Sequence, residues 1–162
     1  MQIENFKNII VTGPQRSGTR ITSLMLADVL HKRYIDEIKI NFDSLSKVFE
    51  FLNSKKDVVL QAPRLSSVIH LIDHPQTAVV FSIRKIEDIK KSEKRVNWKD
   101  DKQIKYYFVE KGEQSILKYD AWKIQKTIMK MPYFENKYGD KWMKDHRLWK
   151  EDRKKFGTIQ TN

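Results

Sequence analysis

A glycine-bounded turn between an apolar run and an amphipathic segment carries the residues best suited to hold an anion. The apolar run ends near Thr12, Gly13 follows it, and Gly18 comes after four further residues. Glycines let a backbone approach an anion closely, and the free N–H groups at the start of a following helix point at the anion with the positive end of the helix dipole behind them. The segment therefore predicts a phosphate-binding turn between a strand and a helix.

The spacing from Gly13 to Gly18 is that of a nucleotide P-loop, but the next two residues differ from that motif. A P-loop continues with Lys, which reaches the β- and γ-phosphates, and with Ser or Thr, which holds magnesium. Here these positions are occupied by Thr19 and Arg20, and a basic residue, Arg16, lies inside the loop. The sequence therefore argues against a magnesium-dependent nucleoside triphosphatase.

Two segments resemble the donor-binding motifs of the sulfotransferases. Pro14–Arg20 is similar to their 5′-phosphosulfate loop, whose usual form is Pro-Lys-Ser-Gly-Thr-Thr or Arg-Ser-Gly-Thr-Thr. Arg84 is followed by Asp88 and, eight residues after the arginine, by Ser92, as in the family's second motif, Arg-x-Pro-x-Asp-x-x-x-Ser, with Ile86 in place of the proline. The resemblance implies a sulfotransferase, a small and divergent member of the family.

A third segment, Asp57–Leu65, is similar to the Lys-x-Pro-Arg-Leu stretch that lies between the two donor motifs in many bacterial sulfotransferases. Gln61 stands where that lysine would be. The resemblance then implies that one cationic contact to the transferring sulfonate is missing. An ordinary turn that ends a strand at Pro63 is the alternative interpretation of this segment.

The resemblance implies that a sulfonate moves from 3′-phosphoadenylyl sulfate to a hydroxyl or amine of a small-molecule or glycan acceptor, leaving adenosine 3′,5′-bisphosphate, with no metal required. Arg84 and Ser92 would hold the 3′-phosphate, and Arg16, as a catalytic residue, would hold the 5′-phosphosulfate and the leaving bridge oxygen. The expected donor-binding residues are Gln15, Arg16, Ser17, Gly18, Thr19, Arg20, Arg84 and Ser92.

The base that takes the acceptor's proton is a separate question. Glu37, in the acidic pair with Asp36 after the first predicted helix, is the candidate. A solvated carboxylate in a turn is the competing interpretation. The heparan-type sulfotransferases carry a glutamate in the helix after the loop, and Leu24 occupies the corresponding position here. A protein that binds the donor without transferring a group therefore stays an alternative.

Alternating strands and helices must position these residues. The pattern predicts an α/β, three-layer P-loop-like fold with a central parallel sheet and ligand sites at the carboxyl ends of its strands. We expect strands near Asn8–Thr12, Ile35–Ile40, Asp57–Gln61 and Ala78–Ile83. We expect helices near Thr19–His31, Ser44–Asn53, Leu65–Leu71, Ile86–Val96 and Ser115–Lys130, with Asp43 or Ser44 capping the second.

The length of 162 residues predicts a single domain, with a donor-binding core over about 8–96 and a basic, aromatic part over about 97–162. The chain has no cysteine, which excludes disulfides and thiolate metal sites. It has no apolar run long enough to span a membrane and no signal peptide at its start, so we expect a cytoplasmic protein. The sequence leaves the oligomeric state open.

The net charge of +11 suits a polyanionic nucleotide, but it also suits a nucleic acid. Basic residues interleaved with aromatic ones would offer phosphate contacts and base stacking, so a nucleic-acid-binding P-loop-like module is one alternative. A small-molecule kinase is another, although it would have to work without the P-loop lysine. The aromatic residues concerned are Trp98, Tyr106, Tyr107, Trp142 and Trp149.

Overall fold

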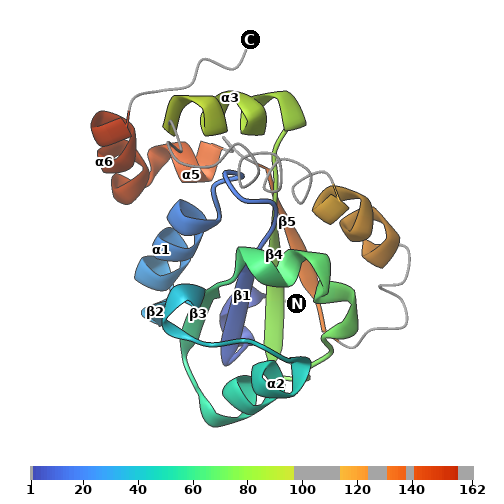
Figure 1. Ribbon diagram of the computed structural model, residues 1–162. Coiled ribbons are helices and arrows are strands. Elements are labelled where there is room, and N and C mark those ends of the chain that lie inside the picture. Colours follow the sequence, from blue (N-terminus) through green and yellow to red (C-terminus); the bar gives the residue numbers. More distant parts are fainter. Residues whose placement is uncertain (1, 97–113, 124–130, 138–140, 157–162) are drawn as a thin grey trace.

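The protein is built around a parallel β-sheet with helices on both faces (Figure 1). The computed structural model describes residues 2–96, 114–123, 131–137 and 141–156. Within them the sheet has five strands in the order β2-β3-β1-β4-β5, and every neighbouring pair is parallel. The predicted three-layer α/β fold with a central parallel sheet is therefore confirmed. The strands are β1 (Asn8–Thr12), β2 (Arg33–Asp36), β3 (Val58–Gln61), β4 (Thr77–Ile83) and β5 (Tyr133–Lys137).

The helices and short 3₁₀ turns connect these strands or follow them. The α-helices are α1 (Thr19–Val29), α2 (Leu45–Ser54), α3 (Ile86–Val96), α5 (Lys141–Asp145) and α6 (Arg147–Phe156), and residues 114–123 are also helical. The 3₁₀ turns are η1 (Ile3–Asn5), η2 (Glu37–Lys39), η3 (Pro63–Ser67) and η4 (Ile69–Leu71). In the described ranges, no helix combines the length and the apolar character that crossing a membrane requires.

Most of the predicted elements are present, with two differences. The strand expected over Ile35–Ile40 ends at Asp36, because the Asp36 side chain accepts a hydrogen bond from the backbone N–H of Ile38 and starts the turn η2. The helix expected over Leu65–Leu71 is instead the pair of 3₁₀ turns η3 and η4. Ser44 caps α2 as expected, since its hydroxyl accepts from the backbone N–H of Lys47. The second half of the helix expected over Ser115–Lys130 lies outside the described residues.

The two faces of the sheet are packed by different helices. On one face Ile9 and Val11 of β1 pack in a core that includes Leu26 of α1. On the other face Ile10 belongs to a larger core that includes α2 and the fully buried Trp122 from the helical residues 114–123. Burying one large apolar side chain stabilises a fold by about 1.5–3 kcal/mol, so these two layers hold the strands in register.

The parallel arrangement brings the carboxyl ends of all the strands to one edge of the molecule, at the top of Figure 1. The glycine turn follows β1 there and leads into α1, η2 follows β2, η3 follows β3, and α3 follows β4. Segments far apart in the sequence therefore meet at this edge. Ligands of open α/β sheets bind at the same place.

Candidate functional site

The turn after β1 is held tightly against β4. Gly13 has φ of 136°, and a Cβ atom at this position would lie 2.5 Å from the carbonyl oxygen of Ser82. A residue with a side chain therefore does not fit here without moving the backbone of β4. At the other end of the turn, Gly18 adopts the left-handed conformation with φ of 97° and is the N-cap of α1. The turn thus delivers the first N–H groups of α1 to the edge where the strands end.

A cluster of Arg16, Arg84 and Ser92 joins the turn to β4 and α3. Arg84 comes directly after β4, is 6% exposed, and donates from Nη1 to the carbonyl oxygen of Arg16 at 2.8 Å. Arg16 donates in turn from Nε to the hydroxyl of the buried Ser92 at 3.3 Å. The structure therefore brings together three of the residues that the sequence analysis selected, from positions up to 76 residues apart.

The other selected loop residues differ in their exposure. Ser17 is buried, and its hydroxyl has no hydrogen-bond partner among the described residues. Thr19 is buried in the first turn of α1, Gln15 is half-buried, and Arg20 is exposed. An unpartnered hydroxyl in a turn of this kind is suited to donate to an anionic oxygen.

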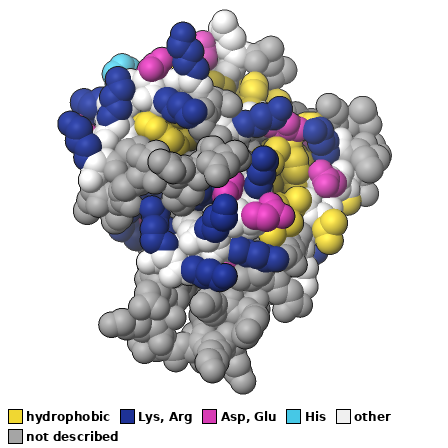
Figure 2. All heavy atoms as spheres, turned by 90° about the horizontal axis from the view of Figure 1, so that it is seen from above, with side chains coloured by type: hydrophobic (Ala, Val, Ile, Leu, Met, Phe, Trp, Pro, Cys, Tyr) yellow, Lys and Arg dark blue, Asp and Glu magenta, His cyan; other side chains and the backbone are white. Residues whose placement is uncertain are grey.

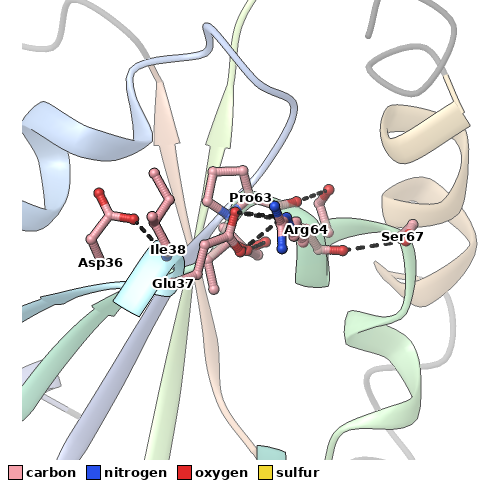
Figure 3. Close-up of polar contacts among 9 residues, drawn as sticks. Asp36, Glu37, Ile38, Pro63, Arg64 and Ser67 are labelled. Carbon is pink, nitrogen blue, oxygen red and sulfur yellow. Dashed lines mark hydrogen bonds and ion pairs between the residues drawn. The ribbon is translucent and has the colours of Figure 1, made fainter. Parts of the chain in front are cut away.

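Glu37 lies on the other side of the glycine turn, at the end of β2. Its carboxylate is almost fully buried and accepts hydrogen bonds from the backbone N–H of Arg64, at 3.0 Å to Oε2 and 3.3 Å to Oε1 (Figure 3). Nε of Arg64 lies 4.0 Å from Oε1 of Glu37, and the Arg64 side chain is 70% exposed. Glu37 is therefore a buried group facing η3, and the interpretation as a solvated turn carboxylate is wrong.

The pKa of Glu37 differs strongly from its ordinary value. This pKa is raised to about 7, mainly by burial and also by the nearby Asp36, while the hydrogen bond and the charge of Arg64 oppose the increase. A carboxyl group with a pKa near neutrality exchanges its proton readily at physiological pH. This position is thus chemically suited to general-base work.

A tyrosine that the sequence analysis missed connects β2 to β3. The hydroxyl of Tyr34 lies 2.6 Å from Oε1 of Gln61 and 3.1 Å from Oδ2 of Asp36. Burial, together with the charge and the hydrogen bond of Asp36, raises the pKa of Tyr34 to about 12, and Arg20 acts in the opposite direction. Tyr34 and Asp36 are two residues apart on one strand and so share a face. Gln61 accordingly interacts with β2 through its side chain.

The aromatic residues of the C-terminal part have varied surroundings. Trp149 is buried against α1 together with Met143 and is part of a core, so its ring is not an exposed stacking surface. Trp142 is half-exposed and lines a cavity of about 340 Å³ with Phe134 and Thr22. Trp98, Tyr106 and Tyr107 lie outside the described residues.

Basic side chains gather around the carboxyl edge of the sheet. Figure 2 views the molecule from this side and shows many Lys and Arg side chains with a few acidic ones between them. The exposed basic residues here include Arg20, Arg64, Lys90, Lys91 and Lys94. This edge is therefore suited to attract anions.

Comparison by sequence finds no matching family and no matching curated protein. Comparison by structure finds solved structures with the same fold, and two of them illustrate the similarity. The first is shikimate kinase from Acinetobacter baumannii in complex with shikimate, with a TM-score of 0.56, 16% identity and 93% of each chain covered. The second is the YorR protein from Bacillus subtilis in complex with phosphorylated GDP, with a TM-score of 0.55, 15% identity, and 90% of this chain and 92% of that chain covered.

These similarities correct the expectation of a sulfotransferase that uses 3′-phosphoadenylyl sulfate. The two structures described above, which match over nine-tenths of the chain, are a kinase and a protein bound to a phosphorylated guanine nucleotide, so the sulfotransferase assignment is wrong. The physical reason lies in the motifs, because a glycine turn before a helix and an arginine after the adjacent strand β4 suit any phosphate and do not identify a sulfonate. What the comparisons show is an α/β fold shared with these two structures.

Proposed function

We propose that the protein is a small-molecule kinase, which transfers a phosphoryl group from a nucleoside triphosphate at the glycine turn to an acceptor between the ends of β2 and β3. The observation that carries this proposal is the buried carboxylate of Glu37. It faces the backbone of Arg64 at the same edge of the sheet as the turn. The proposed donor site after β1 and the candidate base after β2 thus lie at the same edge of the sheet, with β3 between their strands.

The donor half of the proposal rests on the turn and the arginines beside it. The N–H groups at the start of α1, the hydroxyl of Ser17 and the guanidinium groups of Arg16 and Arg84 are suited to hold the phosphates. Phosphoryl transfer demands mainly positioning and stabilisation of spread negative charge, which these groups supply. The nucleotide bound to YorR and the kinase activity named for the other structure agree with this choice.

The acceptor half rests on Glu37 and Arg64. Glu37 would take the proton of the acceptor hydroxyl, whose oxygen then forms a bond to the γ-phosphorus. The bond between this phosphorus and the bridging oxygen breaks, and the nucleoside diphosphate leaves with the electron pair. Because the Arg64 side chain is 70% exposed beside the carboxylate, it is free to meet an anionic group of the acceptor.

The side chains present do not fit the magnesium ion that kinases of this fold hold. Arg20 stands where a P-loop has the Ser or Thr that ligates the metal, and a guanidinium carries no lone pair for a cation. In the described ranges, no group of three or more His, Asp or Glu side chains is arranged to hold a metal ion. No step of the proposed reaction is therefore assigned to a metal.

The test is to incubate the protein with nucleoside triphosphates and a panel of small hydroxyl compounds, with and without a carboxylate or phosphate group, and to follow ³¹P signals of new phosphate esters. We expect Glu37→Gln to lower turnover by roughly 10²–10⁴, the usual contribution of a general base. Glu50→Gln, at an exposed glutamate of α2, is the matched control and should keep the wild-type rate. Transfer by the Glu37→Gln variant at the wild-type rate would exclude Glu37 as the base, and no transfer to any acceptor would refute the kinase.

A further inference from the structure

We infer that the glycine turn binds its nucleotide as a metal-free anion, with arginine side chains in the place of the P-loop lysine and magnesium ion. This inference rests on the proposed function, since it concerns the phosphates of the same donor. The proposed reaction does not specify whether the nucleotide binds with or without magnesium.

The two residues after Gly18 differ in chemistry from the lysine and the hydroxyl residue of a P-loop. Thr19 is 4% exposed in the first turn of α1. Its side chain is short and uncharged, so it cannot bring a positive charge to a terminal phosphate as a lysine would. Arg20 is exposed and replaces the metal-holding hydroxyl with a permanent cation. A divalent cation next to this side chain would be repelled instead of bound.

Two further arginines, Arg84 and Arg16, lie at the glycine turn. Arg84 is fixed against the turn by its hydrogen bond of 2.8 Å to the carbonyl oxygen of Arg16. Arg16 has φ of 67°, in the left-handed region that non-glycine residues seldom adopt. Such a backbone conformation at a ligand site is maintained by its surroundings, and it points to a role for the residue in the turn.

The positive charge of the three arginines can be compared with the charge that a P-loop lysine and a magnesium ion supply. Arg16, Arg20 and Arg84 together carry as much positive charge as one lysine plus one Mg²⁺ ion, so they can neutralise the same donor phosphates. Guanidinium forks also match phosphate oxygens in a bidentate manner, which a metal ion would otherwise arrange. The turn therefore needs no additional cation to hold a nucleoside diphosphate or triphosphate.

The experiment is calorimetric titration of the full chain with ADP and with a non-hydrolysable ATP analogue, once with excess magnesium and once with EDTA. We expect dissociation constants that agree within about threefold, a difference below 1 kcal/mol. Binding that is tenfold or more tighter with magnesium would overturn this inference and leave the proposed kinase intact. No binding under either condition would overturn both.

Two variants sharpen this test. Arg20→Ser removes an exposed side chain, so it should fold normally, and we expect it to weaken binding in EDTA by about tenfold or more. Arg33→Ala, at an exposed arginine at the start of β2 and thus at the opposite edge of the sheet, is the matched control and should leave both dissociation constants unchanged. If wild type and Arg20→Ser bind the nucleotide equally well in EDTA, Arg20 does not contact the phosphates. This result would overturn the proposed binding of the phosphates by three arginines.

Discussion

Replacing Glu37 with glutamine should change how the stability of the protein depends on pH. Burial raises the pKa of Glu37 from 4.5 to about 7 in the folded chain, while the unfolded chain keeps the ordinary value. Between these two pH values the folded chain holds one proton that the unfolded chain has lost. The free energy of unfolding therefore falls as the pH rises through this window, by about 1.4 kcal/mol per pH unit.

The difference between the two pKa values corresponds to about 3 kcal/mol over the whole window. This stabilisation is fully present below about pH 4.5 and is lost as the pH rises through about 7. Glutamine keeps the shape of the protonated acid and still accepts the hydrogen bond from Arg64, but it does not titrate. We therefore expect Glu37→Gln to equal the wild type in stability at low pH and to exceed it by up to about 3 kcal/mol above pH 7.

Urea unfolding of both proteins at several pH values between 4 and 8 measures this difference. The other titrating groups affect both proteins equally, so the difference between the two curves isolates Glu37. A difference that stays constant within about 0.5 kcal/mol across the range would show that Glu37 titrates normally and would refute its burial as the cause of a raised pKa. The same group should give kcat of the proposed transfer an increase with pH whose midpoint lies near 7.

Two other substitutions test the geometry of the site. Gly13→Ala places a methyl group 2.5 Å from the carbonyl oxygen of Ser82, at a residue with positive φ. We therefore expect this substitution to lower the free energy of unfolding by about 2–5 kcal/mol. A loss below about 1 kcal/mol in urea unfolding would contradict the close approach of Gly13 to β4. Tyr34→Phe should remove from the spectrophotometric titration one tyrosine that ionises near pH 12 and should cost about 1 kcal/mol of stability. A variant that instead removes a tyrosine titrating near 10 would contradict the environment of Tyr34.

Much of the fold could be predicted from the sequence because the apolar runs are distinct. β1 was predicted with its observed bounds, Asn8–Thr12, and α3 with Ile86–Val96, since an apolar run or a periodic pattern changes abruptly at each end. β5 was not predicted, because Tyr133–Lys137 contains two charged residues and one amide and does not stand out as an apolar strand. Its partner β4 stabilises it as a strand through the register of Val79 with Tyr133. Tertiary pairing, which local sequence does not contain, decides such elements.

The site could be predicted in part, for a related reason. Arg84 and Ser92 were selected because their spacing after a buried strand resembles a sulfotransferase donor motif, and the structure brings both to Arg16 because the carboxyl ends of β1 and β4 are adjacent. The interaction of Glu37 with Arg64 was not predicted, because the sequence alone does not show that β2 lies next to β3. The identity of the transferred group was predicted wrongly, since residues that bind a phosphate do not by themselves distinguish a phosphoryl from a sulfonyl donor.

Because of the strand order, the proposed donor and acceptor sites lie on opposite sides of the glycine turn after β1. β1 lies between β3 and β4, so Arg64 after β3 and Arg84 after β4 flank the glycine turn from opposite directions. Arg84 hydrogen-bonds the turn itself, while Arg64 pairs with Glu37 from the more distant β2. Because Arg64 pairs with Glu37 on the proposed acceptor side, substitution of Arg64 should change only the KM for the acceptor. Substitution of Arg84 should change only the affinity for the nucleotide. A change of both constants by either variant would mean that the two sites are one, and the division into donor and acceptor sides would be wrong.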